Sequence, residues 1–419
     1  MQDASNRLAG FIHAATVSLE QGNLALSELI CRHILSEFGD NATAYSLLGN
    51  IARRLRLADF SIKYIETAMR LDPTNQMARE LLALARSPAG KIAAPAPEKP
   101  GYLLIKAWGF GFWSDIDHVL GQLLLSEITG RIPVVHWGEN SRFRDSGTSN
   151  AFECFFEPVS RCSIEDLQSP SMSYYPQKWT EKNLKAGEVD KWEGEYSRIA
   201  GLYLLGRDED VVVSDFHTLI RDLVPWIPPG HALHGKSIQG LYRFLVAKYL
   251  KLKPGLSREI DAFASAHLQG KNMLAVHVRG SDKVIEVDRK SLENINKSYK
   301  GAIEEYLSEH RDAEIFLITD SLSVLDEYKK RYGDRLVYTD CARSSDDTGV
   351  HFMTHPSREK MAREVIMDVY LAASCDHFIG NGRSNVSTSV LHLRNWKTDE
   401  FTLFGNSILE EVNFFLHNR

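Results

Sequence analysis

The sequence predicts an α/β protein in which two doubly wound, Rossmann-type domains follow an all-α region of helical repeats. Three observations indicate this fold class. Residues 1–86 carry apolar and small residues at a helical-repeat spacing, residues 87–100 are rich in proline and alanine, and short apolar runs then alternate with helical patterns. We therefore expect helical repeats at 1–86, a linker at 87–100, and α/β domains at 101–255 and 256–419.

Composition excludes several classes of function. The chain has 419 residues, a formal net charge of -6 and 43% hydrophobic residues, which argues against a general nucleic-acid binder because that role needs a basic face. The 5 cysteines form no C-x-x-C pair, so neither a disulfide framework nor a zinc site is expected, and a reducing compartment fits. No apolar run reaches about 18 residues, so we expect a cytoplasmic protein without a membrane span.

The first region resembles tetratricopeptide repeats. In residues 42–73, the aromatic, apolar, small and helix-ending positions of that motif are occupied by Tyr45, Leu48, Gly49, Ala52, Ile65, Ala68 and Pro73. A weaker copy precedes them, and residues 76–86 are expected to close the stack as a helix. Such stacks bind peptides on their concave side, or serve packing and self-association, and the sequence leaves both open.

The first α/β domain is expected to begin with a strand at 102–106, a helix at 116–128 and a strand at 132–137. The loop before the helix contains Gly109 and Gly111, which we expect to help bind an anionic ligand through close backbone approach. A tight turn covered by aromatic rings is the alternative. Asp115 and Asp117 resemble a D-x-D metal motif, but aspartate at a helix start is typical of capping, so no metal is expected.

The last region alternates strands and helices again and predicts a second doubly wound domain. The expected strands are 273–278, 314–319, 336–338 and 377–379, and the expected helices are 300–309, 322–332, 357–373 and 384–393. Two such domains facing each other form the GT-B arrangement, which many nucleotide-sugar transferases use, although a fold alone does not define a chemistry.

Polar side chains follow the expected strand at 273–278. His277, Arg279, Asp282 and Lys283 stand at or just beyond its carboxyl end, where ligands of open α/β sheets bind. Arg279 is predicted to hold a diphosphate bidentately. An ion pair between Arg279 and Asp282 is the structural alternative.

Two further positions fit the same ligand. Asp368 lies in an apolar helical stretch, where an unpaired carboxylate is costly to bury. A carboxylate can accept both adjacent donors on one edge of guanine, a pair that uracil lacks. Arg383, Ser384 and Asn385 lie between a strand and a helix, where amides can receive phosphate oxygens. A partner other than guanine for Asp368, and simple helix capping at Ser384, stay open.

The segment from His277 to Lys283 resembles the H-x-R-x-x-D-K-like segment of the core (α-1,6) fucosyltransferases and of the bacterial nodulation fucosyltransferases. Residues 109–158 are similar to the amino-terminal part of the nodulation enzymes, and residues 317–320 resemble a strand end of the family. The resemblance covers about residues 101–393 and leaves the repeats outside. It implies a GT-B fold and transfer of fucose from GDP-fucose.

The resemblance also implies roles for single residues. Arg279 matches a diphosphate-binding arginine, His277 and Asp368 match nucleoside contacts, and Ser384 and Asn385 match phosphate contacts. Asp282 and Asp320 lie in the similar segments and join the expected binding residues. The chain departs from the family at three positions: Gly280 replaces a second arginine, Asn385 replaces a glutamine, and Val287 stands where the family has a catalytic carboxylate.

We expect direct displacement with inversion at the sugar, stabilised without a metal by guanidinium and helix amides that neutralise the departing GDP. Glu286 is the first candidate for the general base and Asp288 the second, with Lys283 as an orienting group. GDP-fucose is the donor substrate and no cofactor is expected. The acceptor is a glycan or a polypeptide. Another GDP-sugar as donor, or a non-catalytic repeat adaptor with a nucleotide-sensing domain, are the alternatives.

Overall fold

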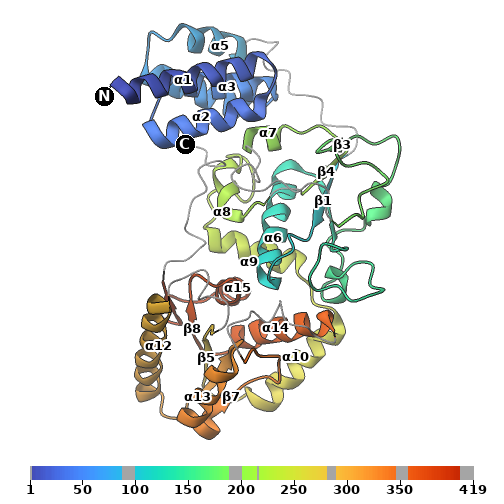
Figure 1. The fold of residues 1–419 in the computed structure, drawn as a ribbon, viewed down its shortest axis with the longest axis vertical. Coiled ribbons are helices and arrows are strands. Elements are labelled where there is room, and N and C mark those ends of the chain that lie inside the picture. The colour runs from blue at the N-terminus through green and yellow to red at the C-terminus, as the bar shows by residue number, and fades with distance from the viewer. Residues whose placement is uncertain are drawn as a thin grey trace.

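The computed structural model describes residues 2–86, 100–187, 201–214, 217–280, 289–345 and 357–405. Its three parts follow one another along the long axis of the molecule, with the helical region at one end and the two α/β domains after it (Figure 1). None of the helices in these ranges has an apolar stretch long enough to cross a membrane.

The amino-terminal region is entirely helical. Its helices are α1 (Gln2–Glu20), α2 (Leu24–Phe38), α3 (Ala42–Arg54), α4 (Ala58–Leu71) and α5 (Gln76–Arg86). Asn23 and Asn41 start two of them, because each side chain accepts a backbone amide, from Leu26 at 3.2 Å and from Ala44 at 2.9 Å. The expected closing helix at 76–86 is confirmed, whereas the tetratricopeptide assignment stays a prediction.

The first α/β domain contains a four-stranded parallel sheet in the order β2-β1-β4-β3. Its strands are β1 (Tyr102–Lys106), β2 (Ile132–His136), β3 (Tyr174–Tyr175) and β4 (Val211–Val213), and its main helices are α6 (Phe112–Thr129), α7 (Gly201–Leu205), α8 (Ile220–Leu223) and α9 (Ile238–Tyr249). The helix expected at 116–128 begins earlier, at Phe112, because Phe112 and Trp113 are buried in its first turn.

The second α/β domain contains a five-stranded parallel sheet in the order β7-β6-β5-β8-β9. Its strands are β5 (Met273–His277), β6 (Glu314–Ile318), β7 (Leu336–Val337), β8 (His377–Asn381) and β9 (Phe401–Phe404), and its helices are α10 (Pro254–His267), α12 (Arg289–Glu309), α13 (Leu322–Tyr332), α14 (Arg358–Ala373) and α15 (Asn385–Leu393). The predicted α/β class with parallel sheets is confirmed.

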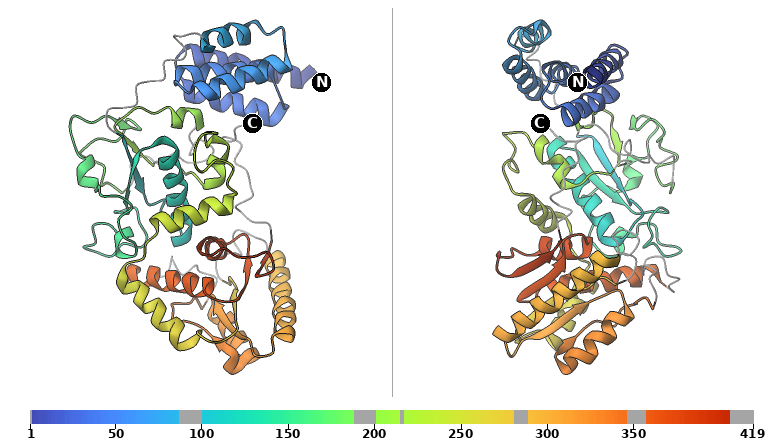
Figure 2. Two further views of the ribbon diagram at one scale, coloured as in Figure 1. Left: turned by 180° about the vertical axis from the view of Figure 1, so that it is seen from behind. Right: turned by 60° about the vertical axis from the view of Figure 1, so that its left-hand side comes forward.

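One continuous hydrophobic cluster extends from the repeats into both α/β domains and includes Ala15, Trp226 and Trp396. In both views of Figure 2 the helical region lies directly beside the first α/β domain. Phe60 of α4 and Trp226 of the first domain are in contact, with ring centroids 5.3 Å apart. The repeats are therefore packed onto the first α/β domain and share its core.

Candidate functional site

The strand order of the second sheet reverses between β5 and β8, which makes this position a topological switch point. The chain after β5 leads to α12, whose Tyr299 packs with Leu274 on one face of the sheet. The chain after β8 leads to α15, whose Val390 belongs with Ala275 to the cluster on the other face. Connections that leave two neighbouring strands toward opposite faces create the crevice in which open α/β sheets bind ligands.

Arg279 lies two residues after β5, at one side of this switch point. Its side chain is 18% exposed, and its Nε lies 3.8 Å from Oδ2 of Asp320, which follows β6. Oδ1 of Asp320 accepts the amide of Gly280 at 2.9 Å. Asp320 therefore orients both the backbone and the side chain at the end of β5, while Asp282, the partner weighed from the sequence, lies outside the described residues.

Gly280 stands where a larger residue does not fit. A Cβ atom at this position would lie 2.6 Å from Cβ of Ser321 and 3.0 Å from a methyl group of Val324. The ends of β5 and β6 can approach each other this closely because Gly280 has no side chain. Glycine in place of a second arginine after Arg279 thus allows the close packing of the backbone at this edge of the sheet.

Ser384 lies at the other side of the switch point, directly before α15. Its side chain is fully buried, and its hydroxyl has no hydrogen-bond partner among the described residues. Although Ser384 is the N-cap residue of α15, its side chain makes no capping bond. Asn385 is half-buried beside it, and Arg383 is exposed. A buried donor at a helix amino end, where the helix dipole favours negative charge, can receive an anion.

His277 contacts the helix α15 and is only 3% exposed. Its Nδ1 lies 2.7 Å from the hydroxyl of Ser387, which also accepts the amide of Asn381 at 2.9 Å. The sequence predicted a direct nucleoside contact for His277. The ring lies between β5 and α15, and Ser387 is one turn beyond Ser384, so His277 supports the amino end of that helix. The nucleoside contact stays a prediction.

Asp368 lies on the buried face of α14 and is 4% exposed. The hydroxyl of Thr339 donates to Oδ1 at 2.5 Å, and the thiol of Cys341 donates to Oδ2 at 3.8 Å. Burial raises the pKa of Asp368 to about 6, against the opposing effect of Thr339 and Arg343. Each carboxylate oxygen has two lone-pair sites, so both oxygens can still accept a ligand donor.

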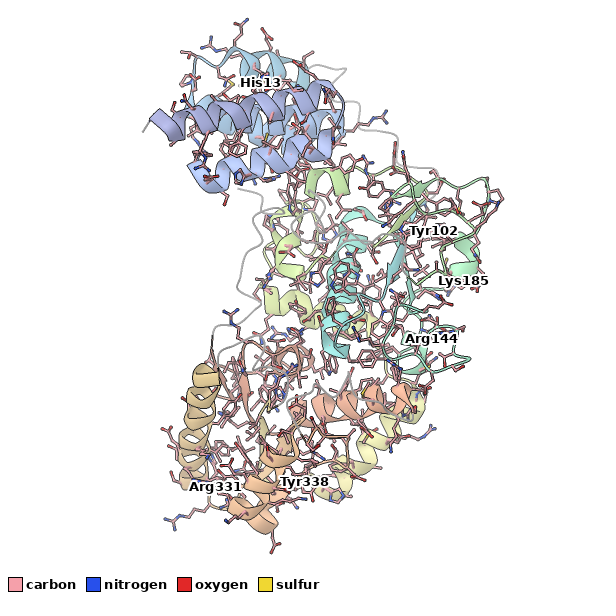
Figure 3. All side chains as sticks on the ribbon, viewed as in Figure 1. His13, Tyr102, Arg144, Lys185, Arg331 and Tyr338 are labelled. Carbon is pink, nitrogen blue, oxygen red and sulfur yellow. The ribbon has the colours of Figure 1, made fainter. Side chains whose placement is uncertain are left out.

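A short segment after β7 connects Asp368 with the end of β6. The segment begins at Tyr338, directly after β7, and this residue is labelled in Figure 3. The guanidinium of Arg343 stabilises the turn of the segment because it donates to the carbonyl of Thr339 at 2.8 Å. The amide of Ser344 then donates to the carbonyl of Asp320 at 2.8 Å. Asp368 and Arg279 therefore lie along the same carboxyl edge of one sheet.

The glycine loop after β1 is held by a carboxylate of the helix that follows it. Both the amide of Gly109 and that of Phe110 donate to the buried carboxylate of Asp115, at 3.0 to 3.1 Å. Gly109 adopts a φ of 91°, which favours glycine. The Gly109 amide is thus engaged within the loop rather than offered to an anion, and Gly111 serves as the N-cap residue of α6.

The second aspartate of the D-x-D pattern is also buried. Asp117 is 2% exposed, and its Oδ1 lies 4.0 Å from Nδ1 of His392, which belongs to α15 of the other domain. Burial raises the pKa of Asp117 to about 8 and lowers the pKa of His392 to about 3. Within the described ranges, no group of three or more His, Cys, Asp or Glu side chains is arranged to hold a metal ion.

The two α/β domains meet where the first turn of α6 contacts α14. The indole of Trp113 donates to the carbonyl of Val365 at 3.3 Å. At the loop between β1 and α6, Arg142 donates to the carbonyl of Gly109 at 2.5 Å, and Arg358 of α14 donates to the carbonyl of Arg142 at 3.1 Å. Arg144, labelled in Figure 3, lies in the same segment after β2 and near this junction.

Four predicted residues lie outside the described part of the chain, namely Asp282, Lys283, Glu286 and Asp288. Three residues that shape the site were not expected from the sequence: Thr339 and Cys341, which bind Asp368, and Ser387, which binds His277. Thr339 and Cys341 closely follow the expected strand at 336–338, so their strand-end position was an available signal. Ser387 lies inside a helix and gave no such signal.

No model of a known protein family and no curated protein matches this chain. Among solved structures, it is similar to fucosyltransferase NodZ from Bradyrhizobium, with a TM-score of 0.47, 19% identity, and coverage of 70% of this chain and 93% of that chain. It is also similar to POFUT1 in complex with GDP-fucose, with a TM-score of 0.47, 14% identity, and coverage of 74% and 100%. Similarities of this size do not identify a family for the chain.

Proposed function

We propose that this protein is a glycosyltransferase with the GT-B arrangement that transfers fucose from GDP-fucose to a hydroxyl group of its acceptor, with inversion and without a metal ion. The observation that carries the proposal is the switch point between β5 and β8. A guanidinium, Arg279, stands at one side of it, and a helix amino end with the buried hydroxyl of Ser384 stands at the other.

These groups suit a diphosphate. Arg279 can donate two parallel hydrogen bonds to phosphate oxygens, and Asp320 keeps its side chain at the end of β5. The hydroxyl of Ser384 and the amides of the first turn of α15 can bind the other phosphate, with Arg383 and Asn385 beside them. Positive charge on both sides of the switch point stabilises the negative charge that grows on a leaving nucleoside diphosphate.

The buried carboxylate of Asp368 favours guanine as the base. Above pH about 6 it is ionised and can accept the ring N–H and the exocyclic amine of guanine together. Uracil has no such neighbouring pair of donors. Burial makes this discrimination strong, because a buried carboxylate that lacks its ligand donors loses hydrogen bonds that water cannot replace.

In the transfer step, the acceptor oxygen forms a bond to the anomeric carbon of the sugar while the bond from that carbon to the β-phosphate oxygen breaks. The electron pair leaves with GDP, and a general base takes the acceptor proton. We assign this base to Glu286 or Asp288, with Lys283 as an orienting group. Fucose as the sugar follows from the resemblance of residues 277–283 to the fucosyltransferase segment, and another GDP-sugar is the alternative.

The proposal is tested by thermal unfolding with GDP or UDP. At about 100 times the dissociation constant, a bound ligand adds about 2.7 kcal/mol to the free energy of unfolding. We expect GDP to raise the melting temperature and UDP to leave it unchanged. Arg279→Ala should abolish the shift and the release of GDP from GDP-fucose, while Arg258→Ala, an exposed arginine of α10, should keep both. Equal shifts with GDP and UDP would contradict the guanine assignment.

A protein that binds GDP but releases it from GDP-fucose no faster than the Arg279→Ala variant would be a nucleotide sensor and not a transferase. The same assay with GDP-mannose in place of GDP-fucose identifies the sugar. Faster release from GDP-mannose would replace fucose by mannose in the proposal.

A further inference from the structure

We propose that four rings at the carboxyl edge of the first sheet form the acceptor subsite, and that the acceptor is a neutral pyranose unit of a glycan. The rings are Trp108, Phe110, His118 and His217, here called the ring platform. This inference rests on the proposed transferase function, which leaves the acceptor open, and it names the class of acceptor.

The ring platform is built from two neighbouring strands. Trp108 and Phe110 follow β1, His217 follows β4, and β1 pairs with β4 in the sheet. The ring centroids of Trp108 and His217 are 5.1 Å apart, and those of Trp108 and Phe110 are 6.4 Å apart. His118 of α6 stacks on His217 at 5.7 Å with an interplanar angle of 14°. The rings thus occupy the edge of the sheet where ligands of α/β domains bind.

The four rings of the platform differ in their exposure to solvent. His118 is fully buried below, Trp108 and His217 are half-buried, and Phe110 is 53% exposed. The backbone that carries Phe110 is fixed, because Asp115 accepts the amides of both Gly109 and Phe110. An exposed aromatic ring on a fixed backbone is a preformed contact surface, which binds a ligand at a lower entropic cost than a mobile loop.

Hydrogen bonds connect the region of the ring platform to α14, the helix that carries Asp368 of the proposed donor site. The loop that carries Phe110 leads into α6, whose Trp113 donates to the carbonyl of Val365 in α14. Its Gly109 accepts a hydrogen bond from Arg142, whose carbonyl accepts one from Arg358 of α14. Asp368 lies on the same helix, one turn after Val365. An acceptor on the ring platform would therefore lie close to the junction between the two domains.

The chemistry of the platform favours a sugar ring over a polypeptide. An aromatic face is apolar and carries partial negative charge, which suits the C–H face of a pyranose. An extended peptide would instead pair with a free strand edge, but β1 and β4 are both paired on their two sides. The strands beside the platform offer no backbone edge.

Saturation-transfer NMR on the full-length protein tests this inference. The probes are neutral tetrasaccharides of glucose, galactose, mannose and N-acetylhexosamine, and a neutral peptide that contains serine and threonine. We expect at least one tetrasaccharide to receive saturation at its ring C–H protons. Phe110→Ala should weaken its binding about tenfold, and Phe110→Trp should restore it, because the contact depends on an aromatic face.

Leu84→Ala is the matched control, since Leu84 of the repeats is also 53% exposed, and it should bind the sugar like the wild type. The inference is overturned if no tetrasaccharide binds, if Phe110→Ala binds as tightly as the wild type, or if only the peptide binds. A GDP-induced thermal shift on each variant separates the two proposals. If the protein binds the sugar through Phe110 but does not bind GDP, the transferase proposal is contradicted, while sugar binding at the ring platform is supported.

Discussion

Asp368 is a buried carboxylate whose ionisation sets a pH range for nucleotide binding. Burial raises its pKa to about 6, so the carboxylate becomes protonated as the pH falls through this value and loses an acceptor for guanine donors. We expect GDP to bind about tenfold more weakly at pH 5 than at pH 7. Isothermal titration over this range measures the effect.

Asp368→Asn should bind GDP weakly, with a pH profile that reflects only the diphosphate of the nucleotide. The diphosphate titrates equally in both proteins, so the difference between the two profiles belongs to Asp368. Parallel profiles for the wild type and the variant would show that Asp368 does not contact the base.

Asp117 makes the free energy of unfolding fall as the pH rises. Its pKa is raised by burial to about 8 in the folded protein, above the usual value of 3.8. The folded state therefore binds a proton that the unfolded state releases between these values, so stability is full below pH about 4 and falls as the pH rises toward 8. Asp117→Asn keeps the shape and removes this dependence.

We expect the Asp117→Asn variant to gain stability relative to the wild type by roughly 1 kcal/mol per pH unit between pH 5 and pH 8. Urea unfolding at several pH values measures the difference. Asp326→Asn, at an exposed aspartate of α13, is the control and should follow the wild type at every pH. A constant difference between the Asp117→Asn variant and the wild type would show that Asp117 is already ionised when folded.

At the scale of the element, a buried ion pair fixes α2 of the repeats to α7 of the first α/β domain. The carboxylate of Glu28 accepts the amides of Leu202 and Tyr203 at 2.9 and 3.0 Å and the guanidinium of Arg32 at 3.2 Å. Arg32 in turn lies over the ring of Trp226, 4.7 Å from its centroid. The carboxylate thus caps α7 from another part of the chain.

Glu28→Ala should lower the free energy of unfolding by about 3 kcal/mol, because it leaves a buried guanidinium without its carboxylate and two amides without an acceptor. Glu66→Ala breaks the Arg86–Glu66 pair, whose side chains are 60% and 52% exposed, and should cost less than about 1 kcal/mol. Chemical denaturation compares the two variants. Similar losses in both would mean that the buried pair does not hold the repeats in place.

At the scale of the whole molecule, the repeats and the first α/β domain share one core. The cluster that contains Ala15 and Tyr64 of the repeats continues through Trp226 into the first domain. We expect these two parts to open together, since their buried apolar residues belong to one cluster.

Trp226→Ala removes the largest shared side chain and should reduce amide hydrogen-exchange protection in α3 and β1 alike. Trp396→Ala removes an equally large ring from the second domain, where its indole donates to Val390, and should leave protection in α3 unchanged. Loss of protection in β1 alone on Trp226→Ala would show that the repeats are an independent unit.

Strands and helices with a strong local pattern were predictable from the sequence. The strand at Tyr102–Lys106 and the helices at 76–86 and 322–332 agree with the structure at every residue. The strand at Val211–Val213 was missed, because three residues give too little pattern, and its pairing with β1 is what places it in the sheet. The positions of Arg279 and Ser384 beside strand ends were predictable for the same local reason.

The sequence by itself determined the strands and helices that have a strong local pattern and the polar residues that follow those strands, because these features repeat over a few residues. The tertiary structure alone decided which of those residues meet. Trp113 reaches Val365 across 252 positions of the chain, and Trp108 meets His217 only because β1 pairs with β4. Contacts of this kind depend on strand order and domain packing, which leave no periodic signal along the chain.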